Sequence, residues 1–302
     1  MKNLVGFLLL LLSLASCHYP REKGNISVVR KNTNLEVYSD SVELERLPIK
    51  NAYVQLYKGA PVVVAEIAVH PKDSIDSIWI KVAHTQEAQG WIREKELVQS
   101  FVPIDIISQF IHLFSDTHAS YFVIIFTLFV LFWLFRAFRK KQLQLVYFND
   151  IDSVYPLFLC LLMAFSATLY ESIQVFAPET WQYYYFNPTL SPFKVPFILS
   201  AFLISIWLFI VVTLAVLDDL FHQLNPATAF FYLLGLVSCC IFCYFFFILT
   251  IPIYIGYVFL LGFVYICIKR MRHSMGYKYR CGQCGRKIRE KGTCPYCGAI
   301  NE

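Results

Sequence analysis

The feature of this sequence that most constrains its fold is the stretch 119–268, which fills half of the 302 residues but carries only five Lys or Arg and six Asp or Glu residues. A helix needs about 20 mostly apolar residues to cross a hydrocarbon core of about 30 Å. Over the whole chain 57% of the residues are hydrophobic and only 16% are charged, against about 25% charged in soluble domains. We therefore predict a multi-domain membrane protein. The composition argues against an ordinary soluble enzyme, a disordered chain and a coiled coil.

Five spans fit this stretch, and they are predicted at 119–138, 154–176, 195–217, 227–249 and 251–268. The apolar run that follows Pro226 is too long for one helix. Pro252 divides it, because proline can end one helix and begin the next. The middle of the chain is thus predicted to be a five-helix transmembrane bundle.

Basic residues flank the predicted spans unevenly. Lys194 is the only one between the second and third spans, whereas four follow the first span: Arg136, Arg139, Lys140 and Lys141. Residues 269–302 hold nine basic and two acidic residues. Because Lys and Arg concentrate on the cytoplasmic side, we predict that the first connection and the basic tail 269–302 are cytoplasmic. Five crossings that begin outside also end inside.

The N-terminus is predicted to be a signal peptide. Lys2 precedes an apolar run from Leu4 to Leu12, which has the charge and length of a secretory signal. Leu14-Ala15-Ser16-Cys17 resembles the lipobox of bacterial lipoprotein signal peptides, which implies cleavage before Cys17, lipidation of its thiol and a location in a bacterial cytoplasmic membrane. The alternative is an ordinary signal, or an uncleaved anchor with an incidental cysteine. In either case residues 18–118 are expected to be exported.

The exported segment is predicted to contain a small all-β domain at about 27–98. Its apolar residues alternate in short runs rich in Val, Ile, Tyr and Trp, with turn residues between them, which is typical of a compact sheet or barrel. Three of its segments resemble a bacterial SH3 domain in order and approximate spacing: 57–64, 79–82 and 90–92. The resemblance departs at 36–40, where the family's usual Asn-Val-Arg-Ser-Gly-Pro is missing.

The SH3-like resemblance implies a ligand of the cell envelope, either peptidoglycan or a proline-rich peptide. Aromatic rings can stack on sugar or peptide faces, so the candidate ligand-binding residues are Tyr38, Tyr57, Trp79 and Trp91. The alternative is that Trp79 and Trp91 are mainly core residues. The aromatic run 181–186, between the second and third spans, is interpreted as an interfacial belt, with a ligand platform as its alternative.

Ionisable residues near the spans offer a transport hypothesis. Glu171 is placed near the outer end of the second span, while Asp218 and Asp219 are placed where the third span meets the cytoplasm. An unpaired charge in hydrocarbon is costly and usually needs a partner or water. Solvation at the membrane surface explains all three positions without transport. Cys239, Cys240 and Cys243 are interpreted as small apolar packing residues.

The C-terminal tail carries the most specific chemical motif. Two Cys-x-x-Cys pairs, Cys281 with Cys284 and Cys294 with Cys297, are separated by nine residues. Four thiolates on two tight turns match the tetrahedral preference of Zn²⁺. The motif resembles a short zinc ribbon at about 279–300 and predicts one structural Zn²⁺ per chain. Four protein ligands leave no open position for catalysis.

Together these features predict a binding or signalling scaffold that couples an envelope ligand outside to a cytosolic protein partner at the ribbon, with membrane lipids around the bundle. The sequence offers no catalytic constellation, so an enzyme is not expected. The basic residues of the ribbon itself are too few to indicate nucleic-acid binding. The competing hypothesis is a transporter or channel that uses Glu171, Asp218 and Asp219.

Overall fold

The computed structural model describes residues 27–46, 53–71, 73, 76–115, 127, 153–275, 279–285, 287–288 and 291–301. The predicted signal peptide with Cys17 lies outside the described residues, as does the first predicted span, 119–138, apart from Thr127. The chain forms two compact units, one of residues 1–142 and 176–200 and the other of residues 143–175 and 201–302.

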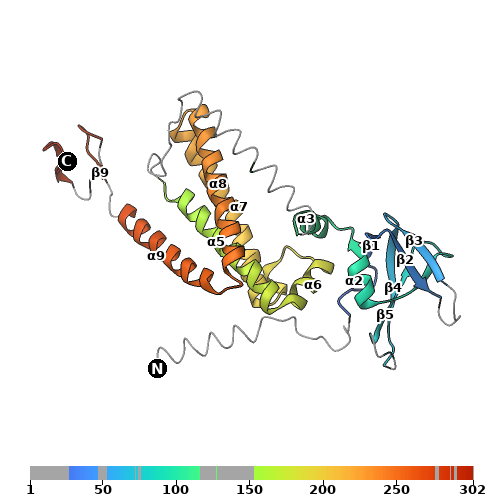
Figure 1. The fold of residues 1–302 in the computed structure, drawn as a ribbon. Coiled ribbons are helices and arrows are strands. Elements are labelled where there is room, and N and C mark those ends of the chain that lie inside the picture. The colour runs from blue at the N-terminus through green and yellow to red at the C-terminus, as the bar shows by residue number, and fades with distance from the viewer. Residues whose placement is uncertain are drawn as a thin grey trace, which may run out of the picture. The chain divides into compact units, whose positions relative to one another are not determined.

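The first unit is built on a curled antiparallel sheet of seven strands, in the order β3-β2-β6-β5-β4-β1-β7 (Figure 1). The strands are β1 Asn34–Val37, β2 Ser41–Glu45, β3 Tyr53–Tyr57, β4 Pro61–Val69, β5 Ile78–Ala83, β6 Gln89–Arg93 and β7 Phe101–Pro103. The sheet ends at β3 on one side and at β7 on the other, so it is a half-barrel. It also extends past the predicted limit of residue 98, because β7 pairs with β1 and buries Phe101.

Alternation of apolar and polar residues sets which face of this sheet becomes the core. Along β5 and β6 the side chains of Ile80, Val82 and Ile92 point inward and are at most 2% exposed. Trp79 and Trp91 directly precede Ile80 and Ile92 in their strands, so they belong to the opposite face. The strands thus form by the two-residue period that the sequence predicts.

Two helices accompany the sheet. α2 Glu94–Ser100 lies between β6 and β7, and α3 Ile106–Ser115 follows β7. The Glu94 carboxylate accepts hydrogen bonds from the Ser27 hydroxyl and the Val28 N–H, both at 2.6 Å, and so ties the start of the domain to α2. Burial raises the pKa of this carboxyl, while the two hydrogen bonds oppose the rise. Leu97 of α2 is fully buried in the sheet's core.

The connection between the second and third predicted spans also belongs to the first unit. It forms helix α6 Pro178–Phe186 and the short 3-10 turn η1 Pro192–Lys194. Phe186 is 2% exposed and lies in the same core cluster as the sheet residues. The aromatic run at 181–186, interpreted from sequence as an interfacial belt, therefore contributes to the core of the β-sheet domain.

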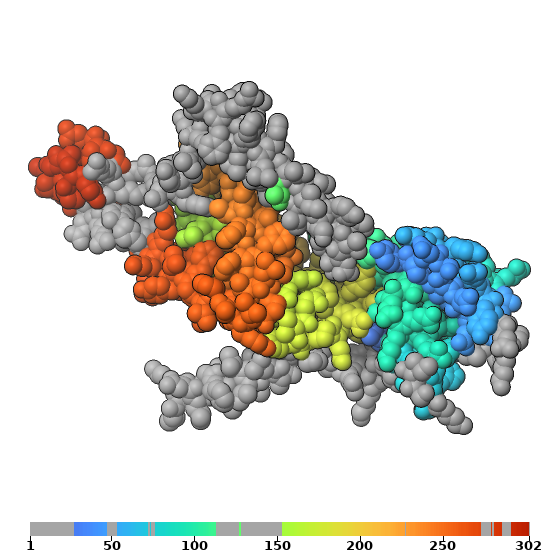
Figure 2. All heavy atoms as spheres, in the orientation of Figure 1, coloured from blue at the N-terminus to red at the C-terminus, as the bar shows by residue number. Residues whose placement is uncertain are grey.

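The second unit contains long apolar helices. These are α5 Tyr155–Phe176, α7 Phe197–Gln223, α8 Pro226–Thr250 and α9 Ile255–Met275. α5, α7 and α8 pack around one cluster that includes Leu159, Val216 and Leu236 (Figure 1). Many large apolar side chains on α8 and α9 are instead exposed, for example Phe242, Leu249, Val258 and Leu261, and the outer surface of these helices is visible in Figure 2.

Three described helices, α5, α7 and α8, are long and apolar enough to cross a membrane. The structure therefore gives three candidate spans among the residues it describes, and not the predicted five. The first predicted span is outside the description. The fifth is shortened, because a turn at 251–254 delays the start of α9 to Ile255 and Lys269 ends its apolar part at Ile268. That segment is about 21 Å long at 1.5 Å per residue, shorter than a hydrocarbon core of about 30 Å.

The tail forms two small hairpins. β8 Tyr279–Arg280 pairs with β9 Lys287–Ile288, and β10 Gly292–Thr293 pairs with β11 Ile300–Asn301. Each hairpin carries one Cys-x-x-Cys pair between its strands.

Replacing Gly90 by Ala is expected to loosen the β-sheet domain, because a Cβ there would lie 2.6 Å from the Cβ of Leu44 and 3.0 Å from the carbonyl oxygen of Glu45. Overpacking of this kind costs about 1–3 kcal/mol. Amide hydrogen exchange, read by mass spectrometry on the full chain, should rise in β2 and β6. Gly235→Ala is the control, since nothing lies within 4 Å of a Cβ added there. Equal exchange in both variants would contradict the prediction.

Candidate functional sites

The four tail cysteines are presented by two similar turns. In the first, the Gly285 N–H donates to the Cys281 carbonyl at 2.9 Å, and in the second the Gly298 N–H donates to the Cys294 carbonyl at the same distance. Gly285 and Gly298 have φ of 69° and 73°, in the left-handed region that favours glycine. The glycine after each Cys-x-x-Cys pair therefore lets the chain close a turn around the two thiols.

The two turns bring all four sulfur atoms together. They lie within 4.8 Å of one another, with 3.5 Å between Cys281 and Cys297 and 3.7 Å between Cys284 and Cys294. A tetrahedral Zn²⁺ with Zn–S distances of about 2.3 Å would hold its ligands about 3.8 Å apart. Cys281 and Cys294 are buried, whereas Cys284 and Cys297 are exposed. The cluster thus fits a small tetrahedral dication such as zinc, as the spacing predicts.

Asn301 holds the two turns together. Its Oδ1 accepts from the Gly282 N–H at 2.9 Å, and its Nδ2 donates to the carbonyls of Ala299 and Gly292 at 3.0 and 3.3 Å. The backbone N–H of Cys284 lowers the pKa of the Cys281 thiol to about 6, with further contributions from the Gln283 N–H and the Asn301 side chain. A lowered thiol pKa favours the thiolate that a metal needs. The cysteine spacing alone gave no signal that would have identified Asn301.

The β-sheet domain carries a separate pocket of about 490 Å³ on its outer face. Arg46 closes one side, where its guanidinium donates to the Glu87 carbonyl at 2.7 Å. The pocket has two cationic groups, one carboxylate, one tryptophan and two side-chain amides, so its net charge is positive. Its lining residues are Arg46, Lys81, Gln86, Glu87, Gln89, Gly90 and Trp91. This combination suits a polar ligand with a negative charge and a face on which the indole can stack.

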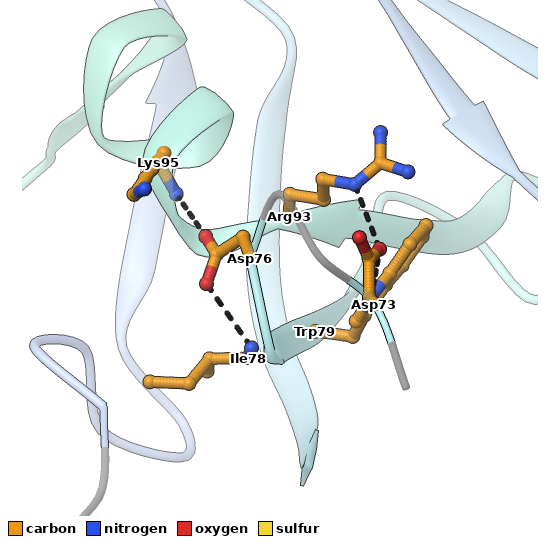
Figure 3. Close-up of polar contacts among 6 residues, drawn as sticks. All are labelled: Asp73, Asp76, Ile78, Trp79, Arg93 and Lys95. Carbon is orange, nitrogen blue, oxygen red and sulfur yellow. Dashed lines mark hydrogen bonds and ion pairs between the residues drawn. The ribbon is translucent and has the colours of Figure 1, made fainter. Parts of the chain in front are cut away.

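Trp79 and Trp91, both predicted to bind ligand, lie near each other on this outer face. His70 makes an edge contact with each, at ring centroid distances of 6.1 and 6.4 Å. Trp79 is nevertheless buried, since Arg93 stacks on its ring at 4.7 Å and Asp73 accepts from both its indole N–H and the Arg93 guanidinium (Figure 3). Trp91 lines the pocket, and Trp79 belongs to the packed layer beside it.

Asp76 braces the same region from the loop before β5. Its carboxylate accepts from the Ile78 N–H at 3.1 Å and from the Lys95 N–H at 2.9 Å, which joins β5 to the first turn of α2 (Figure 3). A carboxylate on the N–H groups of a helix start is a favourable arrangement. The start of β5 and the start of α2 are therefore held together by structural hydrogen bonds.

The two predicted tyrosines lie elsewhere on the domain. The Tyr38 ring contacts His112 of α3 edge-on at 4.7 Å, and the Lys58 ammonium lies 5.3 Å from its centroid. Tyr57 is 65% exposed at the end of β3. Neither tyrosine lines the pocket that Trp91 forms.

The acidic residues of the transport hypothesis are spread along the helices. Asp218 lies in the last turns of α7 and is exposed, 3.3 Å from the His222 ring, and Asp219 is its neighbour. Leu220, near that end of α7, belongs to the same core cluster as Leu159 and Cys160 of α5. Glu171 lies about 16 Å further along α5 than Cys160, at 1.5 Å per residue. The structure does not bring Glu171 together with the two aspartates.

A contact that the sequence did not reveal fastens the α5–α7 connection to the β-sheet domain. The Asn187 amide donates to the Val28 carbonyl at 2.7 Å, and the Ser108 hydroxyl donates to the Tyr185 carbonyl at 2.5 Å. The Arg30 guanidinium donates to the Tyr183 hydroxyl at 2.7 Å. Together with the buried Phe186, these contacts form what we call the loop clamp. Only the aromatic richness of residues 181–186 hinted at it.

The sequence matches no family model, and comparisons with curated proteins and with solved structures give no match. The structure itself provides a curled β-sheet domain, apolar helices and a cluster of four cysteines. The likeness to bacterial SH3 domains and to zinc ribbons rests on the motifs described above.

Replacing Asn301 by Ala should weaken zinc binding by about 10- to 100-fold, as removal of groups that orient metal ligands typically does. The physical reason is the loss of the hydrogen bonds that join the two turns and stabilise the Cys281 thiolate. Competition with a zinc chelator on the full chain measures the effect. Gln283→Ala, which removes an exposed side chain in the first turn, is the control. An Asn301→Ala chain that binds zinc as tightly as the Gln283→Ala chain would refute this role.

Proposed function

We propose that the protein is a membrane-embedded binding or signalling scaffold. Its β-sheet domain binds an envelope ligand outside the membrane, and its zinc-bound tail presents a docking surface to a protein partner in the cytosol. The observation that carries this proposal is the loop clamp, because it joins the pocket-bearing domain to the connection between two candidate spans.

The loop clamp supplies a physical route for coupling. Phe186 is part of the domain's core. It lies in the connection between α5, which ends at Phe176, and α7, which begins at Phe197. A ligand that shifts the strands bordering this core changes the free energy of holding Phe186 in place. Coupling between two sites requires such a shared element whose state both can bias.

The external ligand is proposed to bind in the pocket beside Trp91. Lys81 and Arg46 supply positive charge, and the indole supplies a flat apolar surface. A peptidoglycan fragment carries both carboxylates and sugar or peptide faces. The resemblance to bacterial SH3 domains, which implies such ligands, agrees with this chemistry.

The tail is proposed to hold one structural zinc through Cys281, Cys284, Cys294 and Cys297. Bound zinc would stabilise a fold too small to have a core of its own, since the apparent binding free energy of such sites is about 10 kcal/mol or more. Tyr296 and Ile300 are exposed on this small domain. They provide apolar contact area for a protein partner.

We propose the sides of the membrane on which the β-sheet domain and the tail lie from the loop clamp together with the basic residues. The β-sheet domain contacts the α5–α7 connection directly, which favours the same side of the membrane for both. α9 would then have to cross to bring the tail into the cytosol. Lys269, Arg270 and Arg272 near its end favour that crossing, since long basic side chains can reach water from a short span.

The transporter alternative has weaker support. Asp218 and Asp219 lie at a helix end where solvent explains them, and Glu171 lies far along α5 from that end. Among the residues that the structure describes, the ion pairs join Arg93 to Asp73 and His222 to Asp218, and neither includes Glu171. If Glu171→Gln or Asp218→Asn abolished the cellular role while loss of the β-sheet domain did not, the scaffold proposal would be wrong.

Lys81→Glu is expected to reduce binding of the full chain to peptidoglycan fragments by about tenfold or more, because it reverses a charge in the pocket. Sedimentation of detergent-solubilised protein with purified peptidoglycan measures this. Lys58→Glu makes the same change of charge next to Tyr38, outside the pocket, and should have little effect. Equal loss in both variants would argue against this ligand site.

A cysteine introduced at Leu190 should react with a membrane-impermeant thiol reagent in intact spheroplasts, whereas cysteines at Gln223 and Ser274 should not. Leu190 is exposed in the α5–α7 connection, Gln223 ends α7 and Ser274 lies near the end of α9. All three positions should react after the membrane is permeabilised. Labelling of Ser274→Cys in intact spheroplasts would show that α9 does not cross.

A further inference from the structure

The helical region contains a second group of thiols, separate from the tail. Cys160 on α5 faces Cys240 on α8, with 3.9 Å between their sulfur atoms, and Cys243 of α8 packs against the same core cluster. Cys160 and Cys240 are 4% and 5% exposed. All of these thiols are free in the structure. We call Cys160, Cys240 and Cys243 the thiol cluster.

Helix spacing explains why these sulfur atoms meet. Cys240 and Cys243 are three residues apart and therefore lie on one face of α8. Met163 follows Cys160 by the same spacing on α5 and packs against the same core cluster. One face of α5 and one face of α8 thus both present sulfur to the space between them.

Packing alone does not require this arrangement. The described residues contain five cysteines outside the tail, and every one of them lies in α5, α8 or α9. Of the two outside the thiol cluster, Cys239 packs against the core cluster that contains Cys160 and Cys240. Cysteines used merely as small apolar side chains need not converge on one another. The meeting of buried thiols from two different helices is the observation that points to a ligand.

We propose that the thiol cluster is a second metal site, which binds a soft monovalent cation of the Cu(I) type. Thiolate and thioether sulfur select Cu(I) over hard cations. Cu(I) accepts two or three sulfur ligands, which Cys160, Cys240 and Cys243 can supply. The proposal is independent of the scaffold function and of the zinc in the tail.

Charge in this apolar setting favours a monovalent ion. The core cluster that contains Cys160 and Cys240 is otherwise made of apolar side chains and Tyr232. A net charge there would be expensive in free energy. One Cu(I) bound by one thiolate and by neutral sulfur groups carries no net charge, and its binding releases one proton from the thiol that ionises. A dication would need two ionised thiols to reach the same neutrality.

The test uses the full chain, reduced and loaded with zinc, in detergent or in lipid nanodiscs. Cu(I) is supplied as its complex with a chromophoric chelator, and the transfer of copper to the protein is read from the chelator's absorbance. We expect one Cu(I) per chain to be retained while zinc stays bound, with sulfur neighbours in the copper X-ray absorption spectrum. Cys160→Ser and Cys240→Ser should each lower the Cu(I) affinity by about tenfold or more.

Cys239→Ser is the matched control, because it removes the neighbouring thiol of the same helix while leaving the thiol cluster intact. Cys160→Met keeps a soft sulfur donor and should retain copper, which separates ligation from packing. Circular dichroism and gel filtration show whether each variant folds. If Cys160→Ser does not fold, the two single variants Cys160→Met and Cys240→Ser are enough for the test. The proposal is overturned if the chain retains no copper or if copper binds only by displacing zinc. It is also overturned if Cys160 and Cys240 only form a disulfide, with dioxygen as the oxidant, and no copper remains bound, or if Cys239→Ser weakens binding as much as Cys240→Ser.

Discussion

The pairing of β5 with β6 is the constraint on which most of the β-sheet domain depends. Because side chains alternate along each strand, the register that sends Ile80, Val82 and Ile92 inward also sends Lys81 and Trp91 outward. A slip of one residue would move the core residues to the surface and dismantle the pocket in the same step. The core of the domain and the lining of its pocket are therefore set by one hydrogen-bond register. Gly90 contributes to both, since it lines the pocket and allows β2 to approach β6 closely.

The loop clamp is the contact through which the proposed scaffold would couple its two parts. A domain joined to helices only by a flexible linker can bind a ligand without any effect on the helices. Here the Asn187–Val28 hydrogen bond joins residues that are 159 positions apart, and Phe186 shares a core with the sheet. In the proposed scaffold, a ligand that shifts the sheet would change the free energy of holding Phe186 and so act on the connection between α5 and α7. The two sulfur clusters belong to other parts of the chain and need not take part in this coupling.

Much of this organisation could be predicted from the sequence, because the signals involved are local. Cysteine spacing predicted the four-thiol cluster, alternating apolar residues predicted the sheet, and long apolar runs predicted α5, α7 and α8. The failures arose where distant segments meet. Nothing around residue 186 indicates that Phe186 completes a core begun at Val29, and Asn301 shows its role only when both cysteine turns are folded. The short apolar part of α9 was also missed, because the turn that precedes it uses apolar residues, including Tyr254 at a φ of 62°.

The burial of Phe186 has a consequence for the order in which the protein can be made. The sheet strands end at Pro103, so the ribosome completes them long before it reaches residue 186. Until α5 and the connection after it have been synthesised, the domain lacks an aromatic ring from its core and three of its tethering hydrogen bonds. Closing so long a loop is slow relative to local pairing. The β-sheet domain is thus expected to pass through a partly folded stage that ends only when residue 186 joins its core.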